Sequence, residues 1–529
     1  MLPFMVIIPV LIAVFLFVLS TNKVARVLAI VFQCVFIAVS FYLFSITRYA
    51  EIVTHVGSYD DVLGIILRAN NTVSVFILLT SFIFLAVAIY SYNEEGVRTF
   101  WFLLFILEAV IIGLFLTRDL FNIFVLVEVG TVVITALLMY YRGRRQMFGG
   151  MVFFMLNLVA MQFYLFGIGY LYMLVGAFDL EYVKYHVSNL CDSLLVLPYA
   201  LIMTGLAFKC SIIPLYSFLP KVKVYPAAPS AVVAILSGVQ IKVSVFIFIQ
   251  LQEVFGSFAA ENFFLGIGIA TGLISVFMAM CQSDIKMILA FHTISQVGLI
   301  IIGLSAGSKY SILGGMYHII SHGMFKTTLF LTAGILFHSY GTRDVYKIRG
   351  VMKRLPLVGI ATIAAVLGIT GAPFFIGSIS KYFISTDVPL YVEWSVIIIS
   401  LGTVISFIKY SSMLFGTADP NMTGDAVQAD KWRLAPSVGL GIACLLGGVF
   451  GGPLVRYLFA TDATINPFGY FQKALIFFAS VGIGLLIYNY FVKGNKTLKK
   501  VGNMDVGFRG ICASIGIFFG VLLVVTGLL

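Results

Sequence analysis

The chain has 529 residues, of which 61% are hydrophobic and only 10% are charged, and its formal net charge is +11. A water-soluble chain carries about a quarter charged residues to keep its surface hydrated, so a soluble globular protein is excluded. The six cysteines show no CxxC or other paired spacing, so we expect neither a metal site nor a disulfide framework. The composition predicts an all-α, polytopic membrane protein.

Apolar runs long enough to cross a bilayer, which takes about 20 residues, follow one another along nearly the whole chain. They cover residues 3–20, 24–47, 72–91, 99–117, 119–141, 148–176, 194–217, 226–251, 262–281, 285–306, 309–338, 356–384, 391–415, 434–459, 468–491 and 508–529. We therefore expect about 14–16 transmembrane helices. The longest polar stretches are predicted to be connecting loops, at 49–71, 177–193, 416–433 and 492–507. The first run lacks a basic leader and a small-residue cleavage site, so it is interpreted as a retained helix and not a signal peptide.

Lysine and arginine are distributed unevenly between alternate loops. One set of loops holds Lys23, Arg26, Arg98, Arg142, Arg144, Arg145, Lys221, Lys223, Lys286, Arg343, Lys347, Arg349, Lys353, Arg354, Lys431, Arg433, Lys493, Lys496, Lys499, Lys500 and Arg509. The intervening loops hold only Arg48, Arg68, Arg118, Lys184, Lys309, Arg456 and Lys473. Because loops on the inner side of a membrane carry the excess of Lys and Arg, we expect both termini on the outer side. The positive charge thus reports topology, and we expect no nucleic-acid partner.

A set of ionisable side chains falls inside the predicted helices. Its members are Glu108, Glu128, Lys209, Lys242, His292, His318, His322, Lys326, Lys381 and Lys409. A lysine at the centre of a membrane helix costs about 2.5–3.5 kcal/mol on insertion scales, so these groups should face the protein interior or water. Such residues mark ion pathways, because a buried lysine readily exchanges its proton.

Structural roles are the alternative for single members of this set. Glu128 and Lys209 are candidates for a structural ion pair. Glu108 is either an additional protonation site or the partner of a neighbouring polar group. Lys409 lies near the inner end of its helix, where a lysine can simply extend its ammonium to the membrane surface.

Two predicted helices contain a lysine beside a helix-breaking residue. In the seventh, 194–217, Lys209 is followed by Pro214, which removes a backbone hydrogen bond and breaks the helix. In the twelfth, 356–384, a proline and several glycines interrupt the helix before Lys381. Paired broken helices in corresponding positions indicate ion sites near the membrane midplane.

The helix after each broken helix carries a further lysine, Lys242 in one case and Lys409 in the other. The two sets are offset by five helices. Because an odd offset reverses the direction of the chain across the membrane, the sequence predicts two inverted five-helix repeats with broken helices 7 and 12.

The predicted helix 309–338 places His318, His322 and Lys326 four residues apart. This spacing keeps the three side chains on one helix face, about 6 Å from one to the next. Two histidines four residues apart also suit a metal, but no third carboxylate or cysteine ligand lies nearby in the sequence. A proton relay suits the pattern better, because histidine titrates near physiological pH and is both donor and acceptor when neutral.

His292 lies on the preceding predicted helix and is followed by Ser295 and Gln296. Their hydroxyl and amide groups, together with water, are expected to extend the same hydrogen-bonded path.

Several motifs in a fixed order resemble the antiporter-like subunits of respiratory complex I. They are DLFNIFVLVEV (119–129), FKCSIIPLYSFLP (208–220), YPAAPSAVVAILSGVQIKV (225–243), AFHTISQVG (290–298) and HIISHGMFK (318–326). The chain is most similar to the D-type component of Mrp-type Na⁺/H⁺ antiporters and its relatives in membrane-bound hydrogenases. The resemblance covers roughly residues 70–415, and the helices beyond about 460 exceed those usual for D-type subunits.

The resemblance implies roles for individual residues. Glu128 matches the acidic residue that pairs with the lysine of helix 7, here Lys209, and Lys242 matches the central lysine of helix 8. His318, His322 and Lys326 match the polar face of helix 11, and Lys381 matches the helix 12 position that is lysine or glutamate. In the family these groups form two half-channels joined by a hydrated axis. Glu108 has no counterpart.

The resemblance also implies an organisation and a setting. Residues 1–98 and 434–529 are flanking transmembrane helices, and residues 99–251 and 262–415 are the two half-channels. We expect a subunit of a multi-subunit cation/proton antiporter in a prokaryotic cytoplasmic membrane, with other membrane subunits and the lipid bilayer as partners and with no cofactor of its own.

Two other functions remain open from the sequence. The first is an H⁺- or Na⁺-pumping subunit of a redox-driven complex, whose redox centres would then belong to partners, because this chain has no cysteine cluster or nucleotide motif. The second is a solute carrier or flippase, which would require aromatic and carboxylate groups around a cavity and not a line of lysines.

Overall fold

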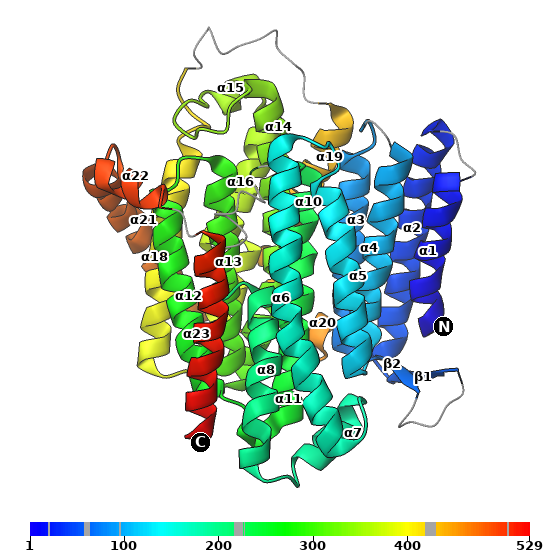
Figure 1. Cartoon of the computed structure of the whole chain (residues 1–529). Helices are drawn as coiled ribbons and strands as arrows, with labels where there is room; N and C mark the ends of the chain where they lie inside the picture. The colour runs from blue at the N-terminus through cyan, green and yellow to red at the C-terminus, as the bar shows by residue number, and fades with distance from the viewer. Residues whose placement is uncertain are drawn as a thin grey trace.

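The computed structural model describes residues 1–18, 22–57, 64–94, 97–215, 226, 228–417, 430–504 and 507–528. Figure 1 shows a bundle of roughly aligned helices with short connections at both ends. Lys221 and Lys223, the end of the predicted helix 194–217, and residues 216–225 and 227 of the quoted motifs lie outside the described residues. So do the central parts of the predicted loops 49–71 and 416–433 and two residues of 492–507.

The described residues contain 14 helices long and apolar enough to cross a membrane. Two shorter apolar helices, Leu2–Val18 and Pro356–Thr370, correspond to the predicted runs 3–20 and 356–384. The prediction of a multi-pass helical membrane protein is therefore confirmed. One predicted span differs: 434–459 is divided into α19 (Lys431–Val449) and α20 (Gly451–Phe459).

The N-terminal part consists of α1 (Leu2–Val18), α2 (Asn22–Thr47) and α3 (Asn71–Tyr90). The predicted loop between α2 and α3 contains a small antiparallel hairpin of β1 (Ile52–Val56) and β2 (Ile65–Ala69), with Ile52 opposite Ala69. Among the described residues, this hairpin is the exception to an otherwise all-α fold. It lies at the lower end of the bundle in Figure 1.

The next helices are α4 (Val97–Leu116), α5 (Leu120–Leu138), α6 (Arg144–Val175) and the short α7 (Leu180–Val187). They are followed by α8 (Asp192–Cys210) and by a helix made of α10 (Ser230–Ile235), the π-helical turn η2 (Leu236–Gln240) and α11 (Ile241–Phe255). A short turn, η3 (Gly256–Phe258), leads to the second group. α8 ends at Cys210, where Ser211 is left-handed, shortly before Pro214.

The second group consists of α12 (Glu261–Cys281), α13 (Ile285–Ser305), α14 (Lys309–Tyr340) and the short α15 (Val351–Arg354). They are followed by α16 (Pro356–Thr370), α17 (Ile376–Ile384) and α18 (Leu390–Ser411). The interruption between α16 and α17 requires glycine: Gly371 has φ of +84°, and a Cβ on Gly377 would collide with the Gly368 carbonyl oxygen. After α19 and α20, the chain ends with α21 (Pro467–Ile487), η5 (Tyr488–Val492), α22 (Lys496–Gly502) and α23 (Phe508–Gly527).

The two groups of helices share structural landmarks at a constant interval of 165 residues. α6 and α14 both have 32 residues and start at 144 and 309, and both end at a left-handed glycine, Gly176 or Gly341. An isolated β-bridge joins Asp119 to Asp179 in the first group, and another joins Asp284 to Asp344 in the second. α7, which follows the first of these pairs, lies at the lower end in Figure 1, and α15, which follows the second, lies at the upper end. These landmarks support an inverted internal repeat.

Candidate functional site

Lys209 is in the last turn of α8 and faces α5, which carries Glu128 and Thr131. The Lys209 ammonium donates a hydrogen bond of 2.8 Å to the Thr131 hydroxyl. Lys209 and Glu128 interact electrostatically, but no ion pair within 4.0 Å joins these two described side chains, and Glu128 Oε1 is buried without a hydrogen-bond partner in the described chain. The sequence indicated that these two charges lie near each other but gave no sign of Thr131, which holds the ammonium.

Lys242 lies at the start of α11, directly after the π-helical turn, and is 2% exposed. Its ammonium donates to the backbone carbonyl of Ser237 within that turn. The Ser237 hydroxyl in turn shares a hydrogen bond of 2.7 Å with the Thr293 hydroxyl on α13. Since a π-helical turn leaves carbonyl oxygens out of the regular ladder, it provides the acceptor for Lys242 and links α11 to the residue beside His292.

Lys326 and His292 lie where α14 packs against α13, and both are fully buried. The Lys326 ammonium donates to the Leu289 carbonyl oxygen at 2.6 Å. The His292 ring packs against Phe407, with the ring centroids 4.6 Å apart, and neither ring nitrogen has a partner in the described chain. Lys326 is also within electrostatic range of both His292 and Lys242.

His318 and His322 lie on the same face of α14 as predicted, with parallel rings whose centroids are 6.4 Å apart. Nδ1 of His318 is 2.8 Å from the Ser380 hydroxyl on α17, and Nε2 is 3.0 Å from Gln296 Oε1 on α13. His322 is equally buried, and both of its nitrogens lack a hydrogen-bond partner among the described residues. His318 thus connects three helices, and Ser380 is the partner that the sequence did not indicate.

Lys381 lies on α17, directly beyond the interruption of helix 12. Its ammonium donates hydrogen bonds of 3.0 Å to the carbonyl oxygens of Ile369 and Thr370, which end α16. The last carbonyls of a helix have no intrahelical partner and carry partial negative charge. The break therefore creates the acceptor for the lysine that follows it.

Lys409 is buried in the same manner and does not extend to the membrane surface. The side chain is 1% exposed, and its ammonium donates to the carbonyl oxygens of Ala279, Met280 and Gln282 at the end of α12, at 3.2, 2.7 and 2.6 Å. Of the two roles left open for Lys409, extension of the ammonium to the membrane surface does not agree with the structure, because helix-terminal carbonyls solvate the ammonium inside the protein.

Glu108 lies apart from these groups, on α4 in the N-terminal part of the bundle. It is fully buried and accepts a hydrogen bond from Gln33 on α2. Hydroxyl contacts continue along the face between α2 and α3, where Ser40 lies 2.9 Å from Ser81. Two roles were predicted for Glu108, an additional protonation site or the partner of a neighbouring polar group. The structure shows such a polar group, Gln33, which the sequence did not identify.

Lys286 is a buried lysine that the sequence analysis assigned to a loop. It is 3% exposed in the first turn of α13 and donates to the Ala228 carbonyl oxygen at 2.9 Å. The Asp284 side chain caps this helix, and burial raises the pKa of its carboxyl against the opposing effect of Arg343. The only sequence signal was its position two residues after a capping aspartate.

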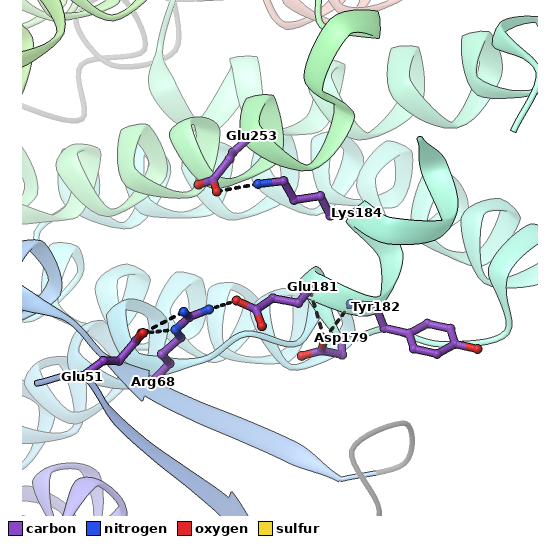
Figure 2. Close-up of polar contacts among 7 residues, drawn as sticks. All are labelled: Glu51, Arg68, Asp179, Glu181, Tyr182, Lys184 and Glu253. Carbon is purple, nitrogen blue, oxygen red and sulfur yellow. Dashed lines mark hydrogen bonds and ion pairs between the residues drawn. The ribbon is translucent and has the colours of Figure 1, made fainter. Parts of the chain in front are cut away.

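Ion pairs join the hairpin to α7, and α7 to α11, at the lower end of the bundle. Figure 2 shows Arg68 of β2 between Glu51 and Glu181, and Lys184 of α7 at 2.8 Å from Glu253 of α11. Asp179 caps α7 by accepting hydrogen bonds from the backbone amides of Glu181 and Tyr182. These contacts hold the lower end of the first helix group.

Among the described residues, no group of three or more His, Cys, Asp and Glu side chains is placed to hold a metal ion.

Comparisons with known proteins agree on one family. The family described as NADH:quinone oxidoreductase/Mrp antiporter, TM, matches residues 117–406. The N component of the NADH-quinone oxidoreductase of Desulforudis audaxviator is 28% identical over 431 residues, covering 76% of this chain and 85% of that protein. The D component of the Na⁺/H⁺ antiporter of Alkalihalophilus pseudofirmus is 26% identical over 454 residues, covering 83% of this chain and 91% of that protein.

Solved structures show the same fold. A chain of the Mrp complex from Dietzia sp. superposes with a TM-score of 0.81 at 22% identity, covering 90% of this chain and 99% of that chain. A chain of respiratory complex I from Thermus thermophilus gives a TM-score of 0.76 at 20% identity, covering 91% and 100%. The family match includes α5, which carries Glu128. It also includes α8, α11, α13, α14 and α17, which carry Lys209, Lys242, Lys286, His292, His318, His322, Lys326 and Lys381, whereas Lys409 lies just beyond it. This chain belongs to the NADH:quinone oxidoreductase/Mrp antiporter family of membrane subunits.

Proposed function

We propose that this chain is a proton-translocating, antiporter-like subunit of a multi-subunit cation/proton antiporter in a prokaryotic cytoplasmic membrane. The observation that carries the proposal is the way in which the buried ammonium groups are held. Lys209, Lys242, Lys326 and Lys381 all donate to neutral hydroxyl or carbonyl oxygens. No carboxylate of the described residues lies within ion-pair distance of any of them.

Neutral acceptors favour proton exchange at these lysines. A carboxylate in contact would fix the charge, whereas a hydroxyl or carbonyl oxygen stabilises the ammonium less. Lys242 and Lys326 also repel each other electrostatically when both are charged. A proton that arrives at one of them therefore favours departure of the proton from the other, so that the groups titrate as a coupled set.

The order of contacts gives a path. Glu128 and Lys209 form the inner part of the first half-channel, within residues 99–251. Lys242 leads through Ser237 and Thr293 to the second group of helices, within residues 262–415, where Lys326 and His292 lie. His322 and His318 then lead toward Lys381. We propose that water molecules form hydrogen bonds with the ring nitrogens of His292 and His322 that lack a partner in the described chain, because buried polar groups require hydrogen bonds.

The remaining helices flank this path. Residues 1–98 cover the first half-channel, and Gln33 of this cover donates a hydrogen bond to Glu108 on α4. Residues 434–529 cover the second half-channel. Both ends of the chain lie in the lower half of the bundle in Figure 1, whereas α15 and α22, which contain several lysines and arginines, lie in the upper half. The excess of basic residues at the upper end supports placing the termini on the outer side.

Protons are the favoured cargo of this subunit. Na⁺ prefers a cage of carboxylate and carbonyl oxygens, whereas the path is lined with lysine ammonium groups that would repel a cation. We propose that Na⁺ crosses elsewhere in the complex. The second candidate function is an ion-pumping subunit of a redox-driven complex, which the similarity to the N component of an NADH-quinone oxidoreductase favours.

The proposal is tested by purifying the native complex from its own membranes, identifying the partner subunits and measuring proton flux in vesicles. Antiporter partners and Na⁺-driven proton flux support the proposed function, and dehydrogenase or hydrogenase partners support the second candidate. Within either complex, Lys209→Ala should abolish proton flux while assembly stays normal. Full flux in Lys209→Ala vesicles would remove the path from the mechanism.

A further inference from the structure

A cavity of about 70 Å³ lies between the interruption of helix 12, α18 and α21. Polar side chains in its wall include Lys381, Thr370, Ser378, Ser400, Ser480 and Lys473. One water needs about 10–15 Å³ of cavity volume measured in this way, so the space admits several waters. The hydroxyl and ammonium groups in the wall provide hydrogen-bond partners for them.

Lys381 is the last ionisable group of the proposed path and forms part of this wall. An ammonium has three N–H donors, and Lys381 uses two of them on the carbonyl oxygens of Ile369 and Thr370. The third donor is left for the cavity. The cavity is therefore in direct contact with the group from which a proton must leave.

Lys473, which lines the cavity, forms an ion pair with Glu393, and both side chains are partly exposed at the protein surface. Glu393 is in the first turn of α18, one turn before the cavity-lining residues Val396 and Ile397, and Lys473 is itself part of the wall. The Glu393 side chain is 31% exposed and the Lys473 side chain is 25% exposed. The pair thus connects the cavity wall with the surface of the described chain.

α21 is anchored to the interruption of helix 12 through tyrosines. The Tyr470 hydroxyl accepts a hydrogen bond of 3.1 Å from the Phe374 backbone amide and lies 2.8 Å from the Ser378 hydroxyl. The Tyr382 hydroxyl accepts from the Asn466 backbone amide at 3.1 Å. α21 lies beyond the family match, which ends at residue 406.

We propose that this cavity is the outlet chamber of the path and that the Lys473–Glu393 ion pair is its gate. A proton leaves Lys381, which becomes neutral, and passes to water in the chamber. Glu393 takes the proton when its contact with Lys473 opens, becomes neutral, and releases it to water on the outer side. The inference rests on the proposed function, because it assigns the last step of the same path.

Filling the chamber is the first test. Ala474 lines the cavity and Ala479 lies on the exposed face of the same helix, so Ala474→Phe and Ala479→Phe form a matched pair. In vesicles containing the native complex, Ala474→Phe should lower proton flux by about tenfold or more, a loss comparable to removal of a proton-transfer step. Ala479→Phe should stay within about twofold of wild type. Equal fluxes in the two variants, at equal amounts of assembled complex, would overturn the outlet assignment.

Removing the gate carboxylate is the second test. Glu393→Gln should slow flux severalfold, and Glu253→Gln, which breaks the Lys184–Glu253 pair at the same end of the bundle, should not. The exchange Lys473→Glu with Glu393→Lys should restore much of the flux, because a carboxylate again borders the chamber. Loss of thermal stability without loss of flux in Glu393→Gln would show that the pair is only structural.

The proton flux of Lys381→Ala, measured in the same vesicles, distinguishes a failure of the outlet chamber from a failure of the proposed path. If Lys381→Ala abolishes flux while Ala474→Phe transports normally, the outlet chamber alone is wrong. If Lys381→Ala transports normally, the proposed path is wrong, whatever the chamber variants show.

Discussion

His322→Ala is the substitution that separates a proton relay from structural packing most clearly. His322 lies between His318 and Lys326 on α14, is fully buried, and has no hydrogen-bond partner on either ring nitrogen within the described chain. Removing the ring therefore breaks no hydrogen bond of the described residues. It opens a gap of about 12 Å along the helix between the two neighbours, eight residues at about 1.5 Å each.

The expected consequences differ strongly for stability and transport. Loss of the ring leaves a cavity, which costs about 1–2 kcal/mol if the surroundings relax partly, and alanine preserves the helix. A hydrogen bond spans about 3 Å, so about three further ordered waters would have to bridge the gap. We expect proton flux to fall by about 10²-fold or more, the usual effect of losing a proton-transfer group.

Tyr317→Phe is the matched control on the same helix. The Tyr317 hydroxyl donates a hydrogen bond of 2.7 Å to the Gly447 carbonyl oxygen on α19, away from the path. Its removal should cost about 1 kcal/mol and leave flux per assembled complex unchanged. His322→Gln should recover part of the flux if hydrogen bonding suffices and none if the group itself must take up a proton.

The assay is proton flux in vesicles with the native complex, measured beside the thermal midpoint in detergent. The relay predicts that both variants lose comparable stability and that only His322→Ala loses transport. Unchanged flux with a lowered midpoint in His322→Ala would refute the relay and assign this face of α14 to packing.

Further variants address other parts of the path. Thr131→Ala should reduce flux less than Lys209→Ala, because it removes only the hydroxyl that holds the ammonium; equal losses in flux would contradict this. Glu128→Asp should retain part of the flux and Glu128→Gln little, and full flux with glutamine would exclude the carboxylate. Gly371→Ala should lower both stability and flux, because a Cβ there meets the Lys381 side chain at 3.0–3.3 Å in a left-handed conformation; wild-type flux would show that the Lys381 position is not critical. Glu108→Gln should leave flux unchanged if Glu108 only pairs with Gln33, and a loss of flux at unchanged thermal midpoint would make it a protonation site.

The sequence determined the membrane character and the set of buried charges. Hydrophobic runs about 20 residues long have few alternatives to a transmembrane helix, and the spans were recovered except for the division near Phe450. The i, i+4 spacing on α14 placed His318 and His322 on one face, as found, because helical periodicity is local. Glycines and a proline located the interruption before Lys381 for the same reason.

Only the tertiary structure decided what each ammonium contacts. The acceptors of Lys242, Lys326, Lys381 and Lys409 are backbone carbonyl oxygens, and backbone atoms leave no trace in the choice of amino acid. Whether such an oxygen is available depends on where a neighbouring helix ends or is distorted, as at the π-helical turn η2. From the sequence, the membrane surface remained one of two possible positions for the Lys409 ammonium, and Lys286 was assigned to a loop. A sequence shows charge and position along the chain, whereas burial depends on the packing of helices distant in sequence.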